Sequence, residues 1–398
     1  MATVACRMKR AVLMQKPTFY EFFAGGGMAR AGLGPGWTCL FANDFDAKKA
    51  ASYAANWGAE HFRLGDIHAL TAADLPGQAD LAWASFPCQD LSLAGMGAGL
   101  KGGRSGAFWG FWDIIHGLKL ERRSPKILVL ENVTGALTSN GGKDFLELCK
   151  ALRVLGYAFG ALTIDAVHFL PQSRPRLFVL ALRKDLEIAP ELTADQPSLP
   201  WASDALLRAR EALPPYLKRD WLWWNLPAPT RRNTSLAQMI EPAPSGVGWH
   251  TREETARLIA MMSEANAAKL KAARSFGKTM VGTIYRRTRH DESGAKVQRA
   301  EVRFDGIAGC LRTPGGGSSR QTVIIVEGKS VRTRLMSPRE AARLMGMPED
   351  YVLPDNYNDA YHLLGDGVAV PVVGFLEGAL LRPILSARVP TPFLAAAE

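Results

Sequence analysis

Short apolar segments alternate with helical segments over the first 185 residues, and this alternation limits the fold more than any other feature. Strand–helix alternation predicts an α/β fold with a doubly wound, mostly parallel sheet. We predict buried strands at Phe19–Ala24, Thr38–Asn43, Asp80–Ser85, Lys126–Glu131, Ala158–Ile164 and Arg176–Leu182. We predict intervening helices at Ala47–Trp57, Ser105–Leu120 and Lys143–Leu155.

The alternation fades after the last of these strands, and proline, tryptophan and glycine clusters take its place. Such a change in composition indicates a second, less regular domain. A helical pattern returns at Pro338–Met345, followed by an apolar tail. We therefore expect a first domain over 1–190, a second, smaller domain over 191–335 and a C-terminal segment over 336–398 that packs back on the first domain.

Basic residues are concentrated in one block of the chain. Residues 201–340 hold 24 Lys/Arg and 13 Asp/Glu, a charge of +11, whereas the whole chain carries +10. A basic block beside a nearly neutral body indicates a polyanion-binding region, such as a nucleic-acid surface. A solvated surface without a partner is the plainer alternative.

The five cysteines are odd in number and far apart, with no C-x-x-C pair and no Cys/His cluster of zinc spacing. We expect no metal site, and a reducing cytoplasm rather than a secreted, disulfide-stapled fold. No apolar run of about 18 residues is free of charge, so we expect no transmembrane helix.

Three features in strand order indicate an adenosine-containing cofactor. The first predicted strand runs into Gly25, Gly26 and Gly27, which permit a tight turn and a close approach of a ligand to the backbone. Asp44 ends the next strand, where an acid can accept hydrogen bonds from ribose hydroxyls, and Asp66 follows a third short strand. Each feature alone also fits a plain turn or a surface acid, and the spacing is not G-x-G-x-x-G.

Reactive side chains follow other predicted strands. Cys88 lies in a loop behind a proline that stiffens the turn, and the glycines after it are typical of a lid. Glu131 ends the most apolar strand, where an unpaired carboxylate is costly. Arg174 and Arg176 share one side of an extended segment. Together they predict a polar pocket that contains a thiol, although an inert thiol and a structural salt bridge would explain them singly.

In this order, these residues resemble the motifs of the DNA (cytosine-5) methyltransferase family, of the bacterial or phage type. The resemblance covers residues 19–185 and 335–375, whereas 186–335 correspond only in position to the family's variable target-recognition region. Glu21 and Asp366 stand where the family usually has Asp and Asn. The matching segments are Phe23-Ala24-Gly25-x-Gly27, Asn43-Asp44-Phe45-Asp46, Gly65-Asp66-Ile67, Pro87-Cys88-Gln89, Glu131-Asn132-Val133, Gln172-x-Arg174-x-Arg176, Arg339-Glu340-Ala341-Ala342-Arg343-Leu344 and Gly365-Asp366-Gly367-Val368.

The resemblance implies a Rossmann-like methyltransferase sheet, a smaller target-recognition domain and S-adenosylmethionine as the methyl donor. It implies methyl transfer to C5 of a flipped-out cytosine in a specific duplex DNA sequence, through a covalent bond between Cys88 and C6. Glu131 would contact N3 and the exocyclic amine. Arg174 and Arg176 would hold O2, a phosphate or Glu131, in roles that the sequence does not separate.

The same resemblance implies the partners and the remaining contacts. We expect double-stranded DNA as the partner, a monomeric enzyme associated with the nucleoid in the cytoplasm, and a cognate restriction endonuclease as a genetic partner. The expected cofactor contacts are Phe23, Gly25, Gly27, Asp44, Phe45, Asp66, Ile67, Pro87 and Asp366. The expected DNA contacts are Ser92, Arg104, Arg312, Ser318, Ser319 and Arg320.

Three alternatives are open at this point. A transfer-RNA (cytosine-5) methyltransferase of the DNA-enzyme type would share the motifs, but the large basic domain after Arg176 favours a duplex reader. A non-catalytic DNA-binding protein would not need Cys88, Glu131 and both arginines together. A Rossmann-like oxidoreductase is disfavoured because no G-x-G-x-x-G is present.

Overall fold

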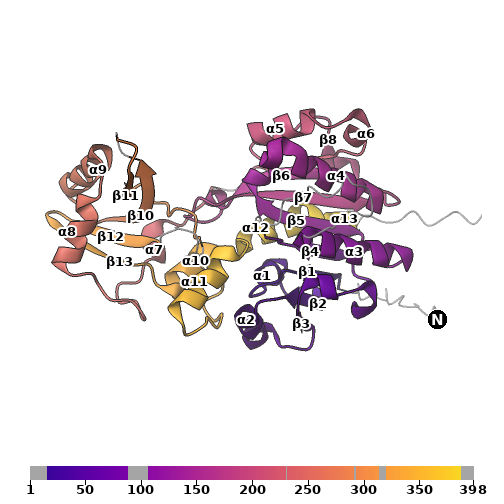
Figure 1. The fold of residues 1–398 in the computed structure, drawn as a ribbon, viewed down its shortest axis with the longest axis horizontal. Helices are drawn as coiled ribbons and strands as arrows, with labels where there is room; N and C mark the ends of the chain where they lie inside the picture. Colours follow the sequence, from indigo (N-terminus) through magenta and orange to yellow (C-terminus); the bar gives the residue numbers. More distant parts are fainter. Residues whose placement is uncertain (1–15, 88–105, 230, 291–292, 313–319, 387–398) are drawn as a thin grey trace, which may run out of the picture.

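The computed structural model describes residues 16–87, 106–229, 231–290, 293–312 and 320–386. Figure 1 shows a larger α/β body and a smaller lobe at opposite ends of the long axis of the molecule. The N-terminal half of the chain lies in the larger body, and the chain returns to that body after building the smaller lobe. The two lobes agree with the expected Rossmann-like sheet accompanied by a second, smaller domain.

A seven-stranded sheet forms the larger body. Its strands are β1 (Thr18–Phe22), β2 (Thr38–Asp44), β3 (Phe62–Leu64), β4 (Leu81–Ala84), β5 (Ile127–Val133), β6 (Tyr157–Asp165) and β7 (Pro175–Arg183). They lie in the order β3-β2-β1-β4-β5-β7-β6, and only β7 runs antiparallel to its neighbours. The mostly parallel sheet is confirmed, and the ends of the six predicted strands agree with the observed ends to within two residues.

Helices cover both faces of this sheet, as strand–helix alternation requires. In the larger body they are α1 (Met28–Leu33), α2 (Ala47–Trp57), α3 (Ala107–Leu120), α4 (Lys143–Leu155), α10 (Pro338–Met345), α11 (Tyr357–Asp366), α12 (Val370–Leu376) and α13 (Arg382–Ser386). One face buries Phe19 and Trp83 with side chains of α1, α2 and the C-terminal helices. The other buries Phe22 and Leu128 with side chains of α3 and α4. The C-terminal helices α10 to α13 thus pack on the sheet of the larger body.

The segment after β7 continues the packing of the larger body. It contains β8 (Thr193–Ala194), α5 (Asp204–Glu211), α6 (Pro215–Lys218) and β9 (Trp223–Trp224). Trp201 and Trp224 are buried in the core of the larger body, and Leu222 bonds to the backbone of Phe159 in β6. Gly160 permits this approach, because a Cβ there would collide with the carbonyl oxygen of Leu222. Since packing does not change at residue 190, we propose that the second domain's own core begins after β9.

The smaller lobe has its own hydrophobic core. It contains α7 (Leu236–Met239), α8 (Arg252–Ala260), α9 (Glu264–Ser275), β10 (Met280–His290), β11 (Lys296–Arg303), β12 (Thr322–Glu327) and β13 (Ser330–Leu335). The antiparallel sheet has the order β11-β10-β12-β13, and Leu258 and Leu270 of the helices pack on Ile284 and Val302. Within β10, only Met280–Ile284 pairs with β12. The rest of β10 therefore continues with β11 as a two-stranded ribbon. We call residues 285–290 and 296–303 the basic ribbon.

One described stretch, Tyr357–Ser386, is long and apolar enough to cross a membrane by length and composition alone. It is interrupted between α11 and α12, and α12 packs against α1. Leu364, Val373 and Leu380 are fully buried in the core of the larger body. Packing inside the protein therefore accounts for the apolar composition of this stretch.

A buried ion pair joins the end of β13 to the start of α10. Arg334 and Glu340 are both inaccessible to solvent, and their guanidinium and carboxylate form two bonds of 2.5 and 2.7 Å. The backbone N–H groups of Ser337 and Glu241 also donate to this carboxylate. The chain is thereby held where it leaves the smaller lobe and re-enters the larger body.

We predict that Glu340→Gln lowers the free energy of unfolding by about 3 kcal/mol, because it leaves a buried guanidinium without its counter-charge. Urea unfolding followed by circular dichroism measures this change. Glu349→Gln is the matched control, because Glu349 pairs with Arg343 at the surface and should contribute about 0.5 kcal/mol or less. Equal stability of the two variants would contradict the prediction.

Candidate active site

The turn between β1 and α1, Phe23–Gly27, is held in a fixed shape by contacts within the protein. We call it the glycine turn. Three of the residues in Phe23–Gly27 have positive φ angles, between +54° and +77°, a region in which glycine is favoured. The indole of Trp57 and the hydroxyl of Tyr351 both donate to the carbonyl oxygen of Gly26, at 2.9 and 2.8 Å. The turn is therefore shaped before any ligand arrives, as a preorganised binding loop requires.

Asp44 connects this turn to the end of β2. Its carboxylate is buried and accepts the N–H groups of Gly25 and Asp46, each at 2.9 Å. Phe45, the next residue, has a side chain that is 67% exposed. The predicted cofactor residues of β1 and β2 therefore meet at one edge of the sheet, at the carboxyl ends of adjacent parallel strands.

Asp66 and Ile67 follow β3, the strand next to β2. Ile67 is buried, whereas Asp66 is exposed and its side chain accepts the N–H of His68 at 2.9 Å. Together with Phe45 these residues suit an adenosine group, because an aromatic face can stack on a base and a carboxylate can accept N–H or O–H donors. Phe45 thus offers an exposed aromatic face beside the buried carboxylate of Asp44.

Glu131 lies near the carboxyl end of β5, beside two polar partners, Arg176 and Ser85. Arg176 Nε is 3.3 Å from Glu131 Oε1, and the Ser85 hydroxyl bonds to the same carboxyl group. Burial raises the pKa of Glu131 above its usual value, although the charges of Arg176 and Arg174 oppose this effect. The carboxyl group therefore holds a proton more readily than an exposed glutamate and can donate it to a ring nitrogen.

The segment that leads to Cys88 is anchored beside Glu131. Asn132 donates from Nδ2 to the carbonyl oxygen of Phe86 at 3.0 Å, which ties the end of β4 to the end of β5. Pro87 follows and is half-buried. Cys88 itself lies outside the described residues, but the described chain stops within one residue of it.

Comparison with known proteins identifies the family. The sequence profile of the C-5 cytosine-specific DNA methylases matches residues 17–382. The chain belongs to the C-5 cytosine-specific DNA methylase family. It is 27% identical to the Type II methyltransferase M.HpaII of Haemophilus parainfluenzae, over 91% of this chain and 88% of that protein. It is 25% identical to M.HhaI of Haemophilus parahaemolyticus, over 90% and 92%. The structure of the S. pombe Dnmt2 methyltransferase shares the fold, with a TM-score of 0.57 at 18% identity, over 93% of this chain and 99% of that chain.

Membership in this family makes the chain an S-adenosylmethionine-dependent cytosine-5 methyltransferase. Within the part of the chain that the structure describes, no group of three or more His, Cys, Asp or Glu side chains is placed to hold a metal ion.

The sequence did not distinguish the roles of Arg174 and Arg176, and the structure distinguishes them by their partners. Arg176 pairs with Glu131, whereas Arg174 donates to the carbonyl oxygens of Leu311, Gly365 and Gly367 at 2.6–2.9 Å. Arg174 is 1% exposed, and burial, followed by the charge of Arg176, lowers its pKa to about 10. Arg174 therefore holds three chain segments together, and Arg176 is the arginine that contacts the Glu131 carboxylate.

Sequence reasoning missed two residues at this junction. Gln172 is fully buried, donates to the carbonyl oxygen of Leu344 at 2.5 Å and accepts the N–H of Leu311 at 3.1 Å. The half-buried Cys310 lies with its sulfur 3.3 Å from Arg174 Nη1 and 3.9 Å from Arg176 Nη2. Burial raises the pKa of the Cys310 thiol, but the charges of the two arginines outweigh it and the pKa is lowered. The place of Gln172 in the Q-x-R-x-R motif could have identified it as a site residue. No local sequence pattern identifies Cys310.

The basic ribbon was also missed, although its sequence signal is visible. Its cationic residues are Arg286, Arg287, Arg289, Lys296, Arg299 and Arg303. Glu301 pairs with both Arg287 and Arg289 on one side of the ribbon. Three basic residues on each of the two paired strands give the ribbon a high density of positive charge.

The expected DNA contacts are only partly visible. Ser92, Arg104, Ser318 and Ser319 lie outside the described residues, and Arg312 is exposed. Arg320 donates to Asn358 and lies over the ring of Tyr357, at 5.5 Å from its centroid. Arg320 is thus engaged with α11 in this structure.

Glu21 is a buried acid beneath the glycine turn. It is 1% exposed, and its Oε1 accepts the N–H of Arg30 at 3.3 Å. Burial raises its pKa to about 8, against the opposing effects of the Arg30 backbone and charge. Glu21 is therefore protonated in the folded enzyme at neutral pH.

We predict that Glu21→Gln stabilises the enzyme at high pH. Below about pH 4.5 Glu21 is neutral in both states, and between that value and about 8 only the unfolded state ionises. The stability that the group contributes is thus lost progressively as the pH rises from about 4.5 to the folded-state pKa of about 8, and the loss is complete above that value. In urea unfolding, the variant should match wild type near pH 4 and exceed it by roughly 4–5 kcal/mol near pH 9.

Glu60→Gln, at an exposed position, is the control and should follow wild type at every pH. A stability difference between Glu21→Gln and wild type that stays constant with pH would show that Glu21 is ionised throughout.

Proposed function

We propose that this methyltransferase methylates C5 of a flipped-out cytosine in a specific sequence of double-stranded DNA, with Cys88 as the nucleophile. The observation that carries the proposal is the convergence at the ends of β4 and β5. There Asn132 anchors the segment leading to Cys88 beside the Glu131–Arg176 pair. The glycine turn follows β1, which is the neighbour of β4, so cofactor and base can be bound at adjacent strand ends.

The chemistry follows from the properties of these side chains. The Cys88 thiolate forms a bond to C6, and the electron pair of the C5–C6 double bond makes C5 nucleophilic. Glu131 donates its proton toward N3, which stabilises the charge that develops on the ring. S-adenosylmethionine would supply the electrophilic methyl group to C5 and leave as S-adenosylhomocysteine. Loss of the C5 proton to solvent then expels the Cys88 thiolate from C6, and the proton on N3 returns to Glu131, which restores the aromatic ring, the thiolate and the acid.

The strand-end residues support binding of the cofactor's adenosine. The exposed ring of Phe45 offers a stacking face, and Asp44 and Asp66 offer carboxylate oxygens to ribose hydroxyls and to the adenine amine. The backbone of Phe23, Gly25 and Gly27 forms the wall beside them. These contacts, with Ile67, Pro87 and Asp366, are our proposed cofactor site.

The smaller lobe supports DNA binding. A two-stranded antiparallel ribbon fits the width of the major groove, and its arginines and lysine can neutralise phosphates and reach base edges. Within residues 191–335, the part after β9, which has its own core and contains this ribbon, is the proposed target-recognition domain. Arg312, Ser318 and Ser319 are proposed as further contacts.

We further propose a monomeric enzyme that acts on DNA in the cytoplasm. The glycine turn, Glu131 and Arg176 all come from one chain, so one copy provides the complete set of described site residues. A cognate restriction endonuclease is the proposed genetic partner, because the curated relatives are named Type II methyltransferases.

We predict that a duplex containing 5-fluorocytosine in place of the target cytosine becomes covalently attached to Cys88, because the C5 fluorine cannot leave as a proton would. Mass spectrometry of the tryptic peptide locates the adduct. Cys88→Ser should form no adduct, transfer no methyl group and still bind DNA, whereas Cys149→Ser should behave like wild type because Cys149 is fully buried. An adduct on another residue would reassign the nucleophile, and preferential trapping by a transfer RNA would replace DNA as the substrate.

We predict that Lys296→Ala/Arg299→Ala weakens binding to duplex DNA and flattens its salt dependence. Each phosphate that the ribbon no longer neutralises should reduce the slope of log affinity against log salt by about 0.9. Fluorescence anisotropy over a range of salt concentrations measures the slope. Lys271→Ala/Arg274→Ala removes the same charge from exposed positions of α9 and should leave the slope unchanged. Equal slopes for the two double variants would exclude the basic ribbon from the interface.

A further inference from the structure

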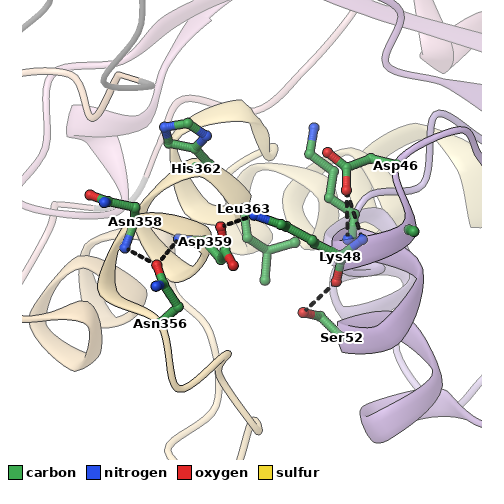
Figure 2. Close-up of a pocket in the computed structure, with 10 residues that line it drawn as sticks. Asp46, Lys48, Ser52, Asn356, Asn358, Asp359, His362 and Leu363 are labelled. Atoms are coloured by element: carbon green, nitrogen blue, oxygen red, sulfur yellow. Dashed lines mark hydrogen bonds and ion pairs between the residues drawn. The ribbon is translucent and has the colours of Figure 1, made fainter.

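Two consecutive lysines of α2 each reach an aspartate of α11. Lys48 Nζ lies 2.8 Å from Asp359 Oδ1, and Lys49 Nζ lies 2.8 Å from Asp366 Oδ2. Figure 2 shows Lys48 extending from α2 to Asp359 beside a cavity of about 590 Å³ between the two helices. The lysines differ in exposure, because the Lys48 side chain is 71% exposed and the Lys49 side chain only 19%, whereas their partners Asp359 and Asp366 are 24% and 45% exposed. The ammonium of Lys49 is therefore shielded from water better than that of Lys48, and its charge acts more strongly on neighbouring groups.

Lys49 is the cation among the acids at the glycine turn. Burial disfavours its charge, but the charge and hydrogen bond of Asp366, together with Asp44 and Asp46, outweigh burial and raise its pKa. Asp44 is the residue that binds the Gly25 N–H. The Lys49–Asp366 pair thus lies at the proposed cofactor site.

The backbone around Asp366 is held firmly against the same turn. Arg174 bonds to the carbonyl oxygens on either side of Asp366, those of Gly365 and Gly367. Gly367 lies so close to the Met28 side chain, at the start of α1, that a Cβ would collide with it. Asp366 therefore stands beside α1 and the glycine turn, whereas Asp66, at the proposed adenosine end, follows the edge strand β3.

A carboxylate at Asp366 is unfavourable without a partner. It is the last residue of α11, and the C-terminal end of a helix repels negative charge. The family's asparagine would offer both N–H donors and an oxygen acceptor there, whereas an aspartate offers acceptors only. Lys49 supplies the missing donors and cancels the added charge.

We propose that Lys49 and Asp366 act as one neutral donor–acceptor unit that binds the amino-acid end of S-adenosylmethionine. The ammonium of Lys49 has donors to offer the cofactor's carboxylate, and the carboxylate of Asp366 has acceptors to offer its ammonium. Lys49 is thus a positioning residue for Asp366 as well as a partner for the ligand. This inference rests on the proposed cofactor site.

Calorimetric binding of S-adenosylhomocysteine to the full-length, ligand-free enzyme tests the pair. We expect Lys49→Met to weaken binding about tenfold or more, because it leaves the Asp366 carboxylate without its cation. Lys49→Met/Asp366→Asn should recover affinity to within about threefold of wild type, because the amide supplies donor and acceptor together. Lys48→Met is the matched control and should bind like wild type, because its pair is exposed. Thermal unfolding of the ligand-free variants checks that each is folded.

A second ligand distinguishes a role in binding from a general effect on the site. Methylthioadenosine keeps the adenosine and the sulfur but lacks the amino-acid end, so Lys49→Met should leave its affinity unchanged. The inference is overturned if Lys49→Met binds S-adenosylhomocysteine as Lys48→Met does, if the double variant recovers nothing, or if both ligands weaken equally. Failure of wild type to bind S-adenosylhomocysteine would instead overturn the proposed cofactor site, and this inference with it.

Discussion

The geometry of the site depends on one buried guanidinium. Arg174 immediately precedes β7 and donates to Leu311, in the connection between β11 and β12, and to Gly365 and Gly367 beside the glycine turn. These partners lie 137 to 193 residues further along the chain, so no local preference could bring them together. Burying an arginine without hydrogen-bond partners would cost several kcal/mol of stability. Any movement of the three segments that broke these bonds would carry the same cost, so the segments are held in one arrangement.

This arrangement gives the two arginines of the motif different tasks. Arg176, two residues on and partly accessible, pairs with Glu131 at the carboxyl end of β5. Arg174 holds the connection between β11 and β12 and the backbone around Asp366 beside the start of β7. The smaller lobe and the end of α11 are thus fastened to the same strand of the larger body, so groups bound at the proposed DNA and cofactor sites would meet at defined positions.

Much of the larger body could be predicted because its signals are local. The strands of the sheet and the helices at Ala47–Trp57, Lys143–Leu155 and Pro338–Met345 follow from periodicity and from glycine and proline at their ends. The region after β7 could not be predicted in the same way, because Trp201 and Trp224 are buried against β6 by long-range packing. The basic ribbon forms because β10 pairs with β11, and amino-acid composition does not predict which strands pair.

The sequence alone determined the strand–helix order, the glycine turn and the residue types of the candidate site, because each is written in neighbouring residues. The tertiary structure decided which arginine reaches Glu131, and that Lys49 neutralises Asp366 from a helix more than 300 residues away in the chain. The reason is that charge pairing inside a protein depends on distance and burial. Both are set by how the elements pack, and a sequence motif fixes neither.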